Sequence, residues 1–135
     1  MLAGTIMTAR RRIEEMAERD ALTGMLNLRT FKAVLKREHE LRARGSRGGY
    51  GILLVDMDDL KELNDAHGHH IGDVLLANVA RTLKSCVRGS DVVARLGGDE
   101  FAILLEDGGD GVDAAEVAAR ILASLEGPFH LEGKE

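Results

Sequence analysis

The chain has 135 residues, of which 44% are hydrophobic, so it can form one domain with a sizeable core and has no room for a second. Its net charge of −5 is unevenly spread, because residues 50–135 carry 17 acidic and only 7 basic side chains. This acidity and the 3% aromatic content argue against a nucleic-acid partner, which would need a basic groove or a stacking platform.

The single cysteine, Cys86, excludes a disulfide within the chain and favours a reducing compartment. Apolar runs such as Ile52–Val55 are far shorter than the roughly 20 residues that span a bilayer. The first residues do not have the pattern of a signal peptide. We therefore expect a cytoplasmic location and no membrane segment in this chain.

The N-terminal segment is charged and helix-prone over residues 8–19, with Ile6, Ile13 and Met16 at intervals of seven and three residues. A short coiled coil and a solvated lead-in helix both fit this spacing. We expect this lead-in over residues 1–19 and the globular domain over residues 20–135. A helix is predicted from Arg29 to Arg44, followed by a loop over Gly45–Gly49. Its apolar face comprises Phe31, Val34, Leu35 and Leu41.

The next strand is predicted over Tyr50–Val55, a continuous apolar run typical of a strand that is buried on both faces. It leads directly into Asp56. A short helix over residues 59–66 and a loop over Gly68–Gly72 follow. A longer helix is then predicted to begin at Asp73, which would cap it. Its apolar stripe comprises Val74, Leu75, Val79, Leu83 and Val87.

Two further strands, Val92–Leu96 and Phe101–Leu105, flank Gly97 and Gly98, and a glycine pair between such runs predicts a two-residue hairpin turn. The adjacent carboxylates Asp99 and Glu100 would then lie at the hairpin tip. A bare Gly-Gly-Asp is more often an ordinary turn with solvated acids than a catalytic site.

A flexible connection is expected over Asp107–Gly111, followed by a last helix that ends at Gly127-Pro128. The apolar stripe of that helix comprises Val117, Ile121, Leu122 and Leu125. The order helix, strand, helix, helix, hairpin, helix predicts an α/β fold, with helices over a mixed, mainly antiparallel sheet.

A metal site is predicted where Asp56 at a strand end and Asp99 at the hairpin tip meet, provided that their strands are neighbours. Magnesium prefers oxygen ligands and commonly binds one or two carboxylates together with phosphate oxygens. Each acid could instead be a helix cap or a turn residue, and this reading suits Asp58 and Asp59 better than Asp56, which directly follows buried apolar residues.

Asn64 and Asp73 form a second pairing. A carboxylate can accept hydrogen bonds from N1 and N2 of guanine while an amide donates to O6, so the pair would favour guanine over adenine. Taken singly, each residue is more simply explained as a helix-end or cap residue.

The chain resembles the GGDEF domains, the diguanylate cyclases that condense two GTP molecules into cyclic di-GMP and pyrophosphate. The resemblance runs from Asp20 to the last residue and rests on four ordered blocks. These are Asp20–Gly24 with Asn27, Arg29 and Phe31; Asp56–Lys61 with Asn64-Asp65, Gly68-His69 and Gly72-Asp73; Arg88–Asp91; and Arg95–Phe101. The resemblance implies a fold like that of nucleotidyl cyclases and polymerase palms.

The resemblance also assigns roles to residues. Magnesium, or manganese in its place, would be held by Asp56, the Met57 carbonyl and Asp99. Guanine would be read by Asn64 and Asp73, and Lys61 would face phosphate. The rest of the substrate site would comprise Leu60, His69, Gly97 and Gly98. Asp99 and Glu100 would lie near the attacking 3′-hydroxyl, with Asp99 assisting its deprotonation.

Arg88 and Asp91 match the family's inhibitory product site, where an arginine can bind phosphate and stack on guanine. A helix-terminal arginine and a strand-leading aspartate are the plain alternative. Because each domain binds one GTP, the resemblance implies an antiparallel homodimer. A longer protein could carry a sensory domain upstream.

The chain departs from the family pattern at Leu60, where phenylalanine is common, and at Leu28, where arginine is common. It also stops at Glu135, before a further strand and before the last helix, which in the family supplies a lysine and an arginine to the triphosphate. Either the sequence is a fragment of a longer protein, or this strand and the two phosphate ligands are missing. We therefore expect a C-terminally incomplete domain from a longer, active enzyme. The alternative function is an inactive module that binds GTP or cyclic di-GMP as a signal. Zinc at His67, His69 and His70 is rejected on spacing, as is an EF-hand at Asp56.

Overall fold

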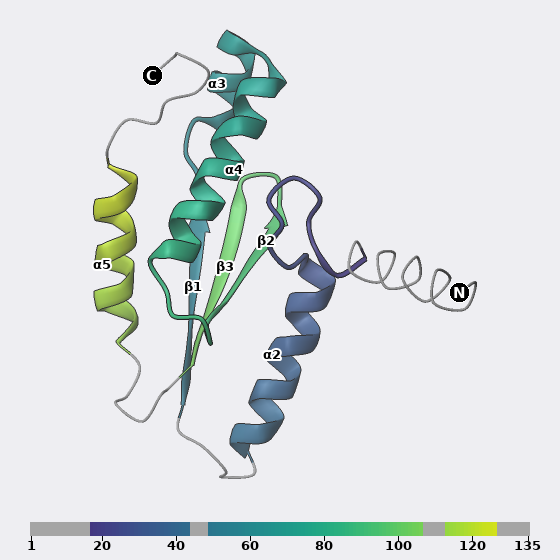
Figure 1. Cartoon of the computed structure of the whole chain (residues 1–135), viewed down its shortest axis with the longest axis vertical. Coiled ribbons are helices and arrows are strands. Elements are labelled where there is room, and N and C mark those ends of the chain that lie inside the picture. Colours follow the sequence, from purple (N-terminus) through teal and green to yellow (C-terminus); the bar gives the residue numbers. More distant parts are fainter. Residues whose placement is uncertain (1–16, 44–48, 107–112, 127–135) are drawn as a thin grey trace, which may run out of the picture.

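The structure is a computed structural model that describes residues 17–43, 49–106 and 113–126 (Figure 1). Within these ranges the elements are α2 (Leu28–Ala43), β1 (Tyr50–Asp56), α3 (Leu60–His67), α4 (His69–Ser85), β2 (Val92–Gly97), β3 (Glu100–Glu106) and α5 (Ala114–Leu125). The predicted order of helices and strands is therefore confirmed. The strand order is β1-β3-β2, and both neighbouring pairs are antiparallel.

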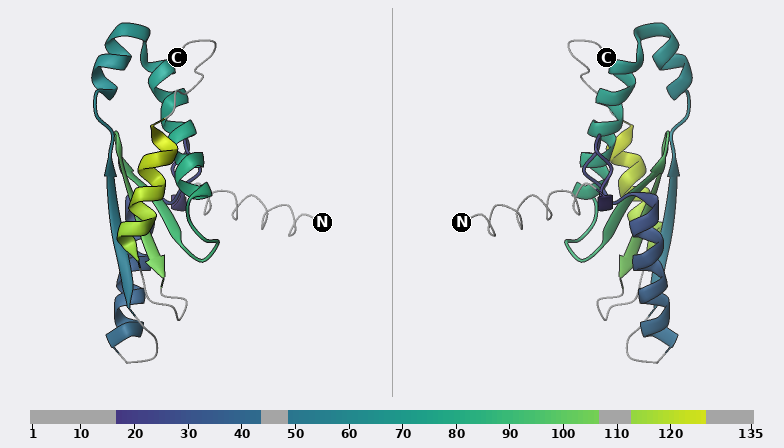
Figure 2. Two further views of the ribbon diagram at one scale, coloured as in Figure 1. Left: turned by 90° about the vertical axis from the view of Figure 1, so that its left-hand side faces the viewer. Right: turned by 90° about the vertical axis from the view of Figure 1, so that its right-hand side faces the viewer.

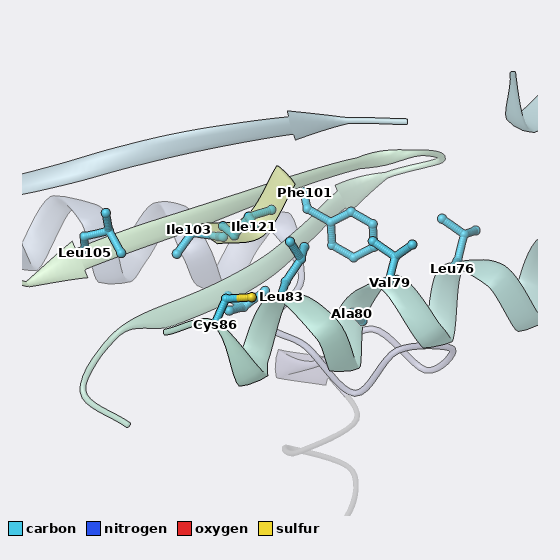
Figure 3. Packing of buried hydrophobic residues seen from close by; sticks show 10 residues of the cluster. Leu76, Val79, Ala80, Leu83, Cys86, Phe101, Ile103, Leu105 and Ile121 are labelled. Atoms are coloured by element: carbon cyan, nitrogen blue, oxygen red, sulfur yellow. The ribbon is translucent and has the colours of Figure 1, made fainter. Parts of the chain in front are cut away.

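Helices cover both faces of this sheet, α2 on one side and α4 with α5 on the other (Figures 1 and 2). The central strand β3 is buried on both faces, and its side chains alternate between two cores. Ala102 and Leu104 pack in the same cluster as Phe31 of α2. The larger cluster, seen in Figure 3, joins β3 to α4, β2 and α5; its members include Leu83, Phe101, Ile103 and Ile121.

Strand β1 is half-covered, and the prediction that it is buried on both faces is wrong. Leu53 and Val55 pack against the larger core, whereas Ile52 and Leu54 on the other face are 41% and 75% exposed. The reason is the strand order. Among the described residues, β1 is an edge strand that pairs only with β3, and α2 packs over β2 at the opposite edge. A continuous apolar run cannot distinguish such a strand from a central one.

Helix α4 begins four residues earlier than predicted, at His69, so residues 69–72 are helical and do not form a loop. Gly68 is the N-cap, with a φ of 91°, and it alone separates α3 from α4. A left-handed glycine turns the chain within one residue, which removes the need for a longer loop. Asp73 consequently lies inside α4 and does not cap it.

The last helix is capped at Asp113, whose side chain accepts a hydrogen bond from the Glu116 N–H at 3.0 Å. Ile121 is buried, as its place in the predicted stripe requires, but Leu122 is 63% exposed. Several predicted features lie wholly or mostly outside the described residues: the lead-in at 1–16, the loop at 45–48, the connection at 107–111 and the Gly127-Pro128 stop. Among the described helices, none combines the length and apolarity needed to cross a membrane.

Candidate active site

The hairpin between β2 and β3 carries the candidate site at its tip. Gly97 pairs with Glu100, so the two turn residues are Gly98 and Asp99. The predicted turn, Gly97-Gly98, is therefore displaced by one residue. Gly98 has a φ of 45° while Asp99 does not have a positive φ, which is the sign pattern of a type II′ turn with glycine first. A register shift between Arg95 and Gly97 accompanies the turn.

Strand pairing brings the end of β1 to this tip. Asp56 is paired with Glu100, and the Met57 N–H donates to the Asp99 backbone carbonyl at 3.1 Å. One carboxylate oxygen from each of Asp56, Asp99 and Glu100 lies within 4.8 Å of the other two. The predicted meeting of Asp56 and Asp99 is confirmed, and Glu100 joins them because it directly follows the turn.

The three carboxylates fit a divalent cation. Three negative charges this close repel one another, and none of the ion pairs in the described ranges involves any of them. Hard divalent cations bind carboxylate oxygens and would relieve that repulsion. Asp56 and Glu100 are exposed and Asp99 is half-buried, so a phosphate ligand can reach the group from solvent.

The Arg95 side chain holds the turn through hydrogen bonds to its backbone, a contact that was not predicted from the sequence. Its Nε and Nη2 donate to the Gly98 carbonyl at 3.1 and 2.9 Å, and its Nη1 lies 3.1 Å from Oδ1 of Asp20. Asp20 also accepts hydrogen bonds from the N–H and hydroxyl of Thr23. Arg95 and Asp20 belong to two of the blocks quoted for the family resemblance, which was the only signal pointing to them.

Partial burial alone would raise the pKa of Asp20. The two hydrogen bonds from Thr23, followed by the charge and hydrogen bond of Arg95, outweigh that effect and hold its pKa below the ordinary value. Asp20 is therefore a fixed negative charge near neutral pH. It anchors Arg95 while Arg95 holds the turn.

The predicted guanine pair lies on two packed helices, Asn64 on α3 and Asp73 on α4. Asp73 is exposed, as is His69 in the first turn of α4. Oδ1 of Asn64 is buried and has no hydrogen-bond partner among the described residues. An unpartnered buried oxygen is unusual, and it makes Asn64 a candidate for a role beyond packing.

The other predicted substrate residues differ in their surroundings. Lys61 is exposed in the first turn of α3, whereas Leu60 is half-buried and packs against the larger core. Asp59, just before them, has a φ of 64°, a left-handed conformation that aspartate tolerates better than most residues. Gly97 and Gly98 are both exposed.

Arg88 and Asp91 lie in the connection that precedes β2. Asp91 is only 4% exposed, and its two carboxylate oxygens accept hydrogen bonds from the N–H groups of Arg88 and Glu106, at 2.9 and 3.0 Å. The exposed Arg88 side chain donates to the Glu106 carbonyl at 3.3 Å. Asp91 therefore holds this connection against the end of β3, while the Arg88 guanidinium remains reachable from solvent.

A groove of about 620 Å³ runs beside the site, between β1 and helices α4 and α5. It is mainly apolar, with Leu54 and Leu122 among its lining residues, and Asp56 and Asp58 lie at its polar end.

Residues 17–135 match the family described as diguanylate cyclase, GGDEF domain. The chain belongs to the GGDEF domain family. This GGDEF domain is 42% identical over 120 residues to the diguanylate cyclase TpbB of Pseudomonas aeruginosa. The aligned residues make up 88% of this chain and 27% of TpbB. It is 40% identical over 128 residues to an uncharacterized signaling protein of Caulobacter vibrioides, covering 94% of this chain and 16% of that protein.

Solved structures have the same fold. The GGDEF domain of TpbB from Pseudomonas aeruginosa matches with a TM-score of 0.77 and 39% identity, covering 86% of this chain and 67% of that one. A GGDEF domain of DgcB from Caulobacter crescentus, solved in complex with c-di-GMP, matches with a TM-score of 0.70 and 28% identity, over 80% of this chain and 60% of that one. The expected cyclase-like α/β fold is confirmed.

This GGDEF domain spans only 16% and 27% of the length of the two curated relatives described above. Diguanylate cyclases of the family depend on a metal ion, which agrees with the convergence of three carboxylates at the hairpin tip.

Proposed function

We propose that this chain is a diguanylate cyclase domain, which condenses two GTP molecules into cyclic di-GMP and releases two pyrophosphates. The observation that carries the proposal is the approach of Asp56, Asp99 and Glu100 to within 4.8 Å of one another at an exposed hairpin tip. The relatives named diguanylate cyclase, at about 40% identity, support the same reaction.

The metal in this proposal is Mg²⁺, with Mn²⁺ as the alternative, held by Asp56, the Met57 carbonyl and Asp99. All three residues lie where β1 ends beside the turn, as the hydrogen bond from the Met57 N–H to the Asp99 carbonyl requires. When bound, the ion would neutralise triphosphate charge and stabilise the oxygens of the reacting phosphate.

The substrate is GTP, with its guanine read by Asn64 and Asp73 and its phosphates facing Lys61. An amide and a carboxylate on the packed helices α3 and α4 supply the donor and acceptor that O6 and the N1–N2 edge need. His69, Leu60, Gly97 and Gly98 complete this site in the proposal. Because Leu60 packs against the larger core, its role in this proposal is an apolar contact with the guanine ring and not a hydrogen bond.

In each half-reaction, the 3′-hydroxyl oxygen of one GTP forms a bond to the α-phosphorus of the other. The bond from that phosphorus to the pyrophosphate breaks, and the hydroxyl proton leaves with the help of Asp99, with Glu100 beside it. Two such steps close the ring. Since each domain holds one GTP, an antiparallel homodimer is required, and the upstream part of a longer protein would control it.

Product inhibition is proposed at Arg88 and Asp91. The exposed guanidinium of Arg88 can bind a phosphate of cyclic di-GMP, whereas the buried Asp91 carboxylate holds the backbone that presents it. Asp91 thus contributes mainly through the shape of the connection.

The decisive experiment incubates the purified chain with GTP and MgCl₂ and separates the nucleotides by chromatography, after its dimeric state has been established. We expect cyclic di-GMP from the wild type and none from Asp99→Ala. The control is Glu40→Ala, which removes an exposed carboxylate on α2, away from the hairpin. A folded, dimeric wild type that binds GTP without turnover would refute the proposal and favour a module that binds nucleotide as a signal.

A further inference from the structure

Gly72 on α4 faces the side chain of Asn64 on α3 at very short range. A Cβ atom placed on Gly72 would lie 1.8 Å from Oδ1 of Asn64 and 2.7 Å from its Cγ. Real Cβ atoms do not approach other heavy atoms this closely. No side chain at position 72 is therefore compatible with the observed position of the Asn64 amide.

Conformational freedom does not explain this glycine. Gly72 is not among the glycines with a positive φ, and it lies within the regular helix α4, where glycine is a weaker helix former than any residue except proline. It is also buried, so solvent exposure is not the reason. What Gly72 provides is space, and the group that fills this space is the Asn64 amide.

The contact orients the amide. Its oxygen is enclosed against Gly72 without a hydrogen-bond partner in the described part of the chain, whereas its nitrogen lies farther from the Gly72 Cβ position, at 3.0 Å against 1.8 Å. Nδ2 is not among the buried unpartnered atoms of those residues. The Asn64 amide therefore turns its acceptor towards α4 and leaves its donor for a ligand.

We propose that Gly72 is the positioning residue that sets the preference of this site for a 6-oxopurine over a 6-aminopurine. The amide donor can bind the acceptor at O6 of guanine and has no acceptor to offer to a 6-amino group. A methyl group at position 72 would displace the amide and remove that discrimination. This role rests on the proposed function, because it presumes that Asn64 reads the purine of GTP.

The test measures binding without turnover, by calorimetry with α,β-methylene triphosphates that carry guanine, 2,6-diaminopurine or hypoxanthine. Gly72→Ala should reduce the preference for guanine over 2,6-diaminopurine about tenfold, the usual effect of losing one buried hydrogen bond. The preference for guanine over hypoxanthine reports the 2-amino group, which is assigned to Asp73, and should not change. Gly49→Ala is the control, since a Cβ at Gly49 meets nothing within 4 Å.

The double variant Asn64→Ala/Gly72→Ala separates positioning from a general packing defect. Asn64→Ala should reduce the preference for guanine over 2,6-diaminopurine to the part that the N1–H bond to Asp73 supplies, and adding Gly72→Ala should not reduce it further. If Gly72→Ala alone does not fold, the double variant must fold, because the atoms nearest to the added Cβ all belong to Asn64. A double variant that stays unfolded overturns the role of Gly72.

The remaining outcomes distinguish this role from the proposed function. A wild type that prefers guanine, together with a Gly72→Ala variant that keeps the same preference, overturns the role of Gly72 alone. Equal losses against 2,6-diaminopurine and hypoxanthine also overturn it, because they indicate a general loss of the site. A wild type with no preference for guanine overturns both the role of Gly72 and the reading of guanine by Asn64 and Asp73.

Discussion

The guanidinium of Arg95 joins the carboxylate of Asp20, 3.1 Å away, to the carbonyl of Gly98 in the turn that carries Asp99. The two ends of this contact are 78 residues apart in the chain, yet one side chain spans them. The backbone N–H of Arg95 also donates to the Leu26 carbonyl, so the segment before α2 lies against β2. The position of the hairpin tip therefore depends on the N-terminal segment.

Replacing Arg95 by alanine should impair both stability and turnover. The change leaves the partly buried Asp20 carboxylate without its cation and the Gly98 carbonyl without its donors, a loss of about 1–3 kcal/mol in the free energy of unfolding. Turnover should fall further than GTP binding, because the variant frees the turn that carries Asp99. Urea denaturation and steady-state assays measure the two effects. Arg37→Ala, which removes an exposed arginine on α2, is the control. A variant with wild-type turnover would contradict this role.

Protonation of Asp20 at low pH should weaken the contact between Asp20 and Arg95. Because the folded pKa of Asp20 is lowered, its ionised form stabilises the fold fully above the ordinary carboxyl pKa of 3.8, and this contribution is lost as the pH falls below that value. In Asp20→Asn, the free energy of unfolding should therefore fall less steeply below about pH 4 than in the wild type. Urea titrations at a series of pH values compare the slopes. Equal slopes would mean that Asp20 ionises in the folded state as it does in the unfolded chain.

The hairpin could be predicted from local signals in the sequence, and the approach of Asp56 to Asp99 could be predicted on the condition that their strands are neighbours. A glycine pair between two apolar runs defines a hairpin. A carboxylate directly after an apolar strand lies at the end of that strand, and it reaches the hairpin tip because β1 pairs with β3. The one-residue displacement of the turn onto Gly98 and Asp99 depends on the register shift after Arg95, which residue types do not encode.

The other contacts between distant segments could not be predicted. The exposure of Leu54 follows from the edge position of β1, and the early start of α4 follows from the φ of Gly68. The Asn64–Gly72 contact requires the angle between α3 and α4, which a single glycine sets. Each feature depends on how elements pack in three dimensions, and apolar periodicity along the chain carries no such information.

Two leucines offer a matched test of the core. Leu83 of α4 is fully buried, whereas Leu54 of β1 is 75% exposed. Leu83→Ala should cost about 2–5 kcal/mol of unfolding free energy, because it leaves a cavity in the larger core. Leu54→Ala should cost less than about 0.5 kcal/mol. Chemical denaturation of both variants measures the difference. A large loss in Leu54→Ala would mean that this face of β1 is covered in solution.

Alanine substitutions of Arg88 and Asp91 should both relieve product inhibition but should differ in their effect on stability if only Arg88 contacts the product. Arg88→Ala should relieve inhibition by cyclic di-GMP and change stability by less than about 1 kcal/mol, because its side chain is exposed. Asp91→Ala should also relieve inhibition, but at a cost of about 1–3 kcal/mol, since it leaves two N–H groups without their acceptor. Inhibition curves and thermal unfolding together test this. An Asp91→Ala variant of wild-type stability would instead favour direct contact with the product.

The effect of a charge-neutralising substitution at the hairpin tip on thermal stability should have opposite signs with and without bound metal. Without a divalent cation, the carboxylates of Asp56, Asp99 and Glu100 repel one another, so Glu100→Gln should raise the thermal midpoint slightly in EDTA. With excess Mg²⁺, binding to the folded state raises the thermal midpoint of the wild type, and the midpoint of Glu100→Gln should rise by less. Thermal unfolding with EDTA and with MgCl₂ gives both comparisons, and Glu40→Gln controls for the change in net charge. Equal stabilisation of the wild type and Glu100→Gln by Mg²⁺ would mean that the charge of Glu100 contributes nothing to metal binding by Asp56, the Met57 carbonyl and Asp99.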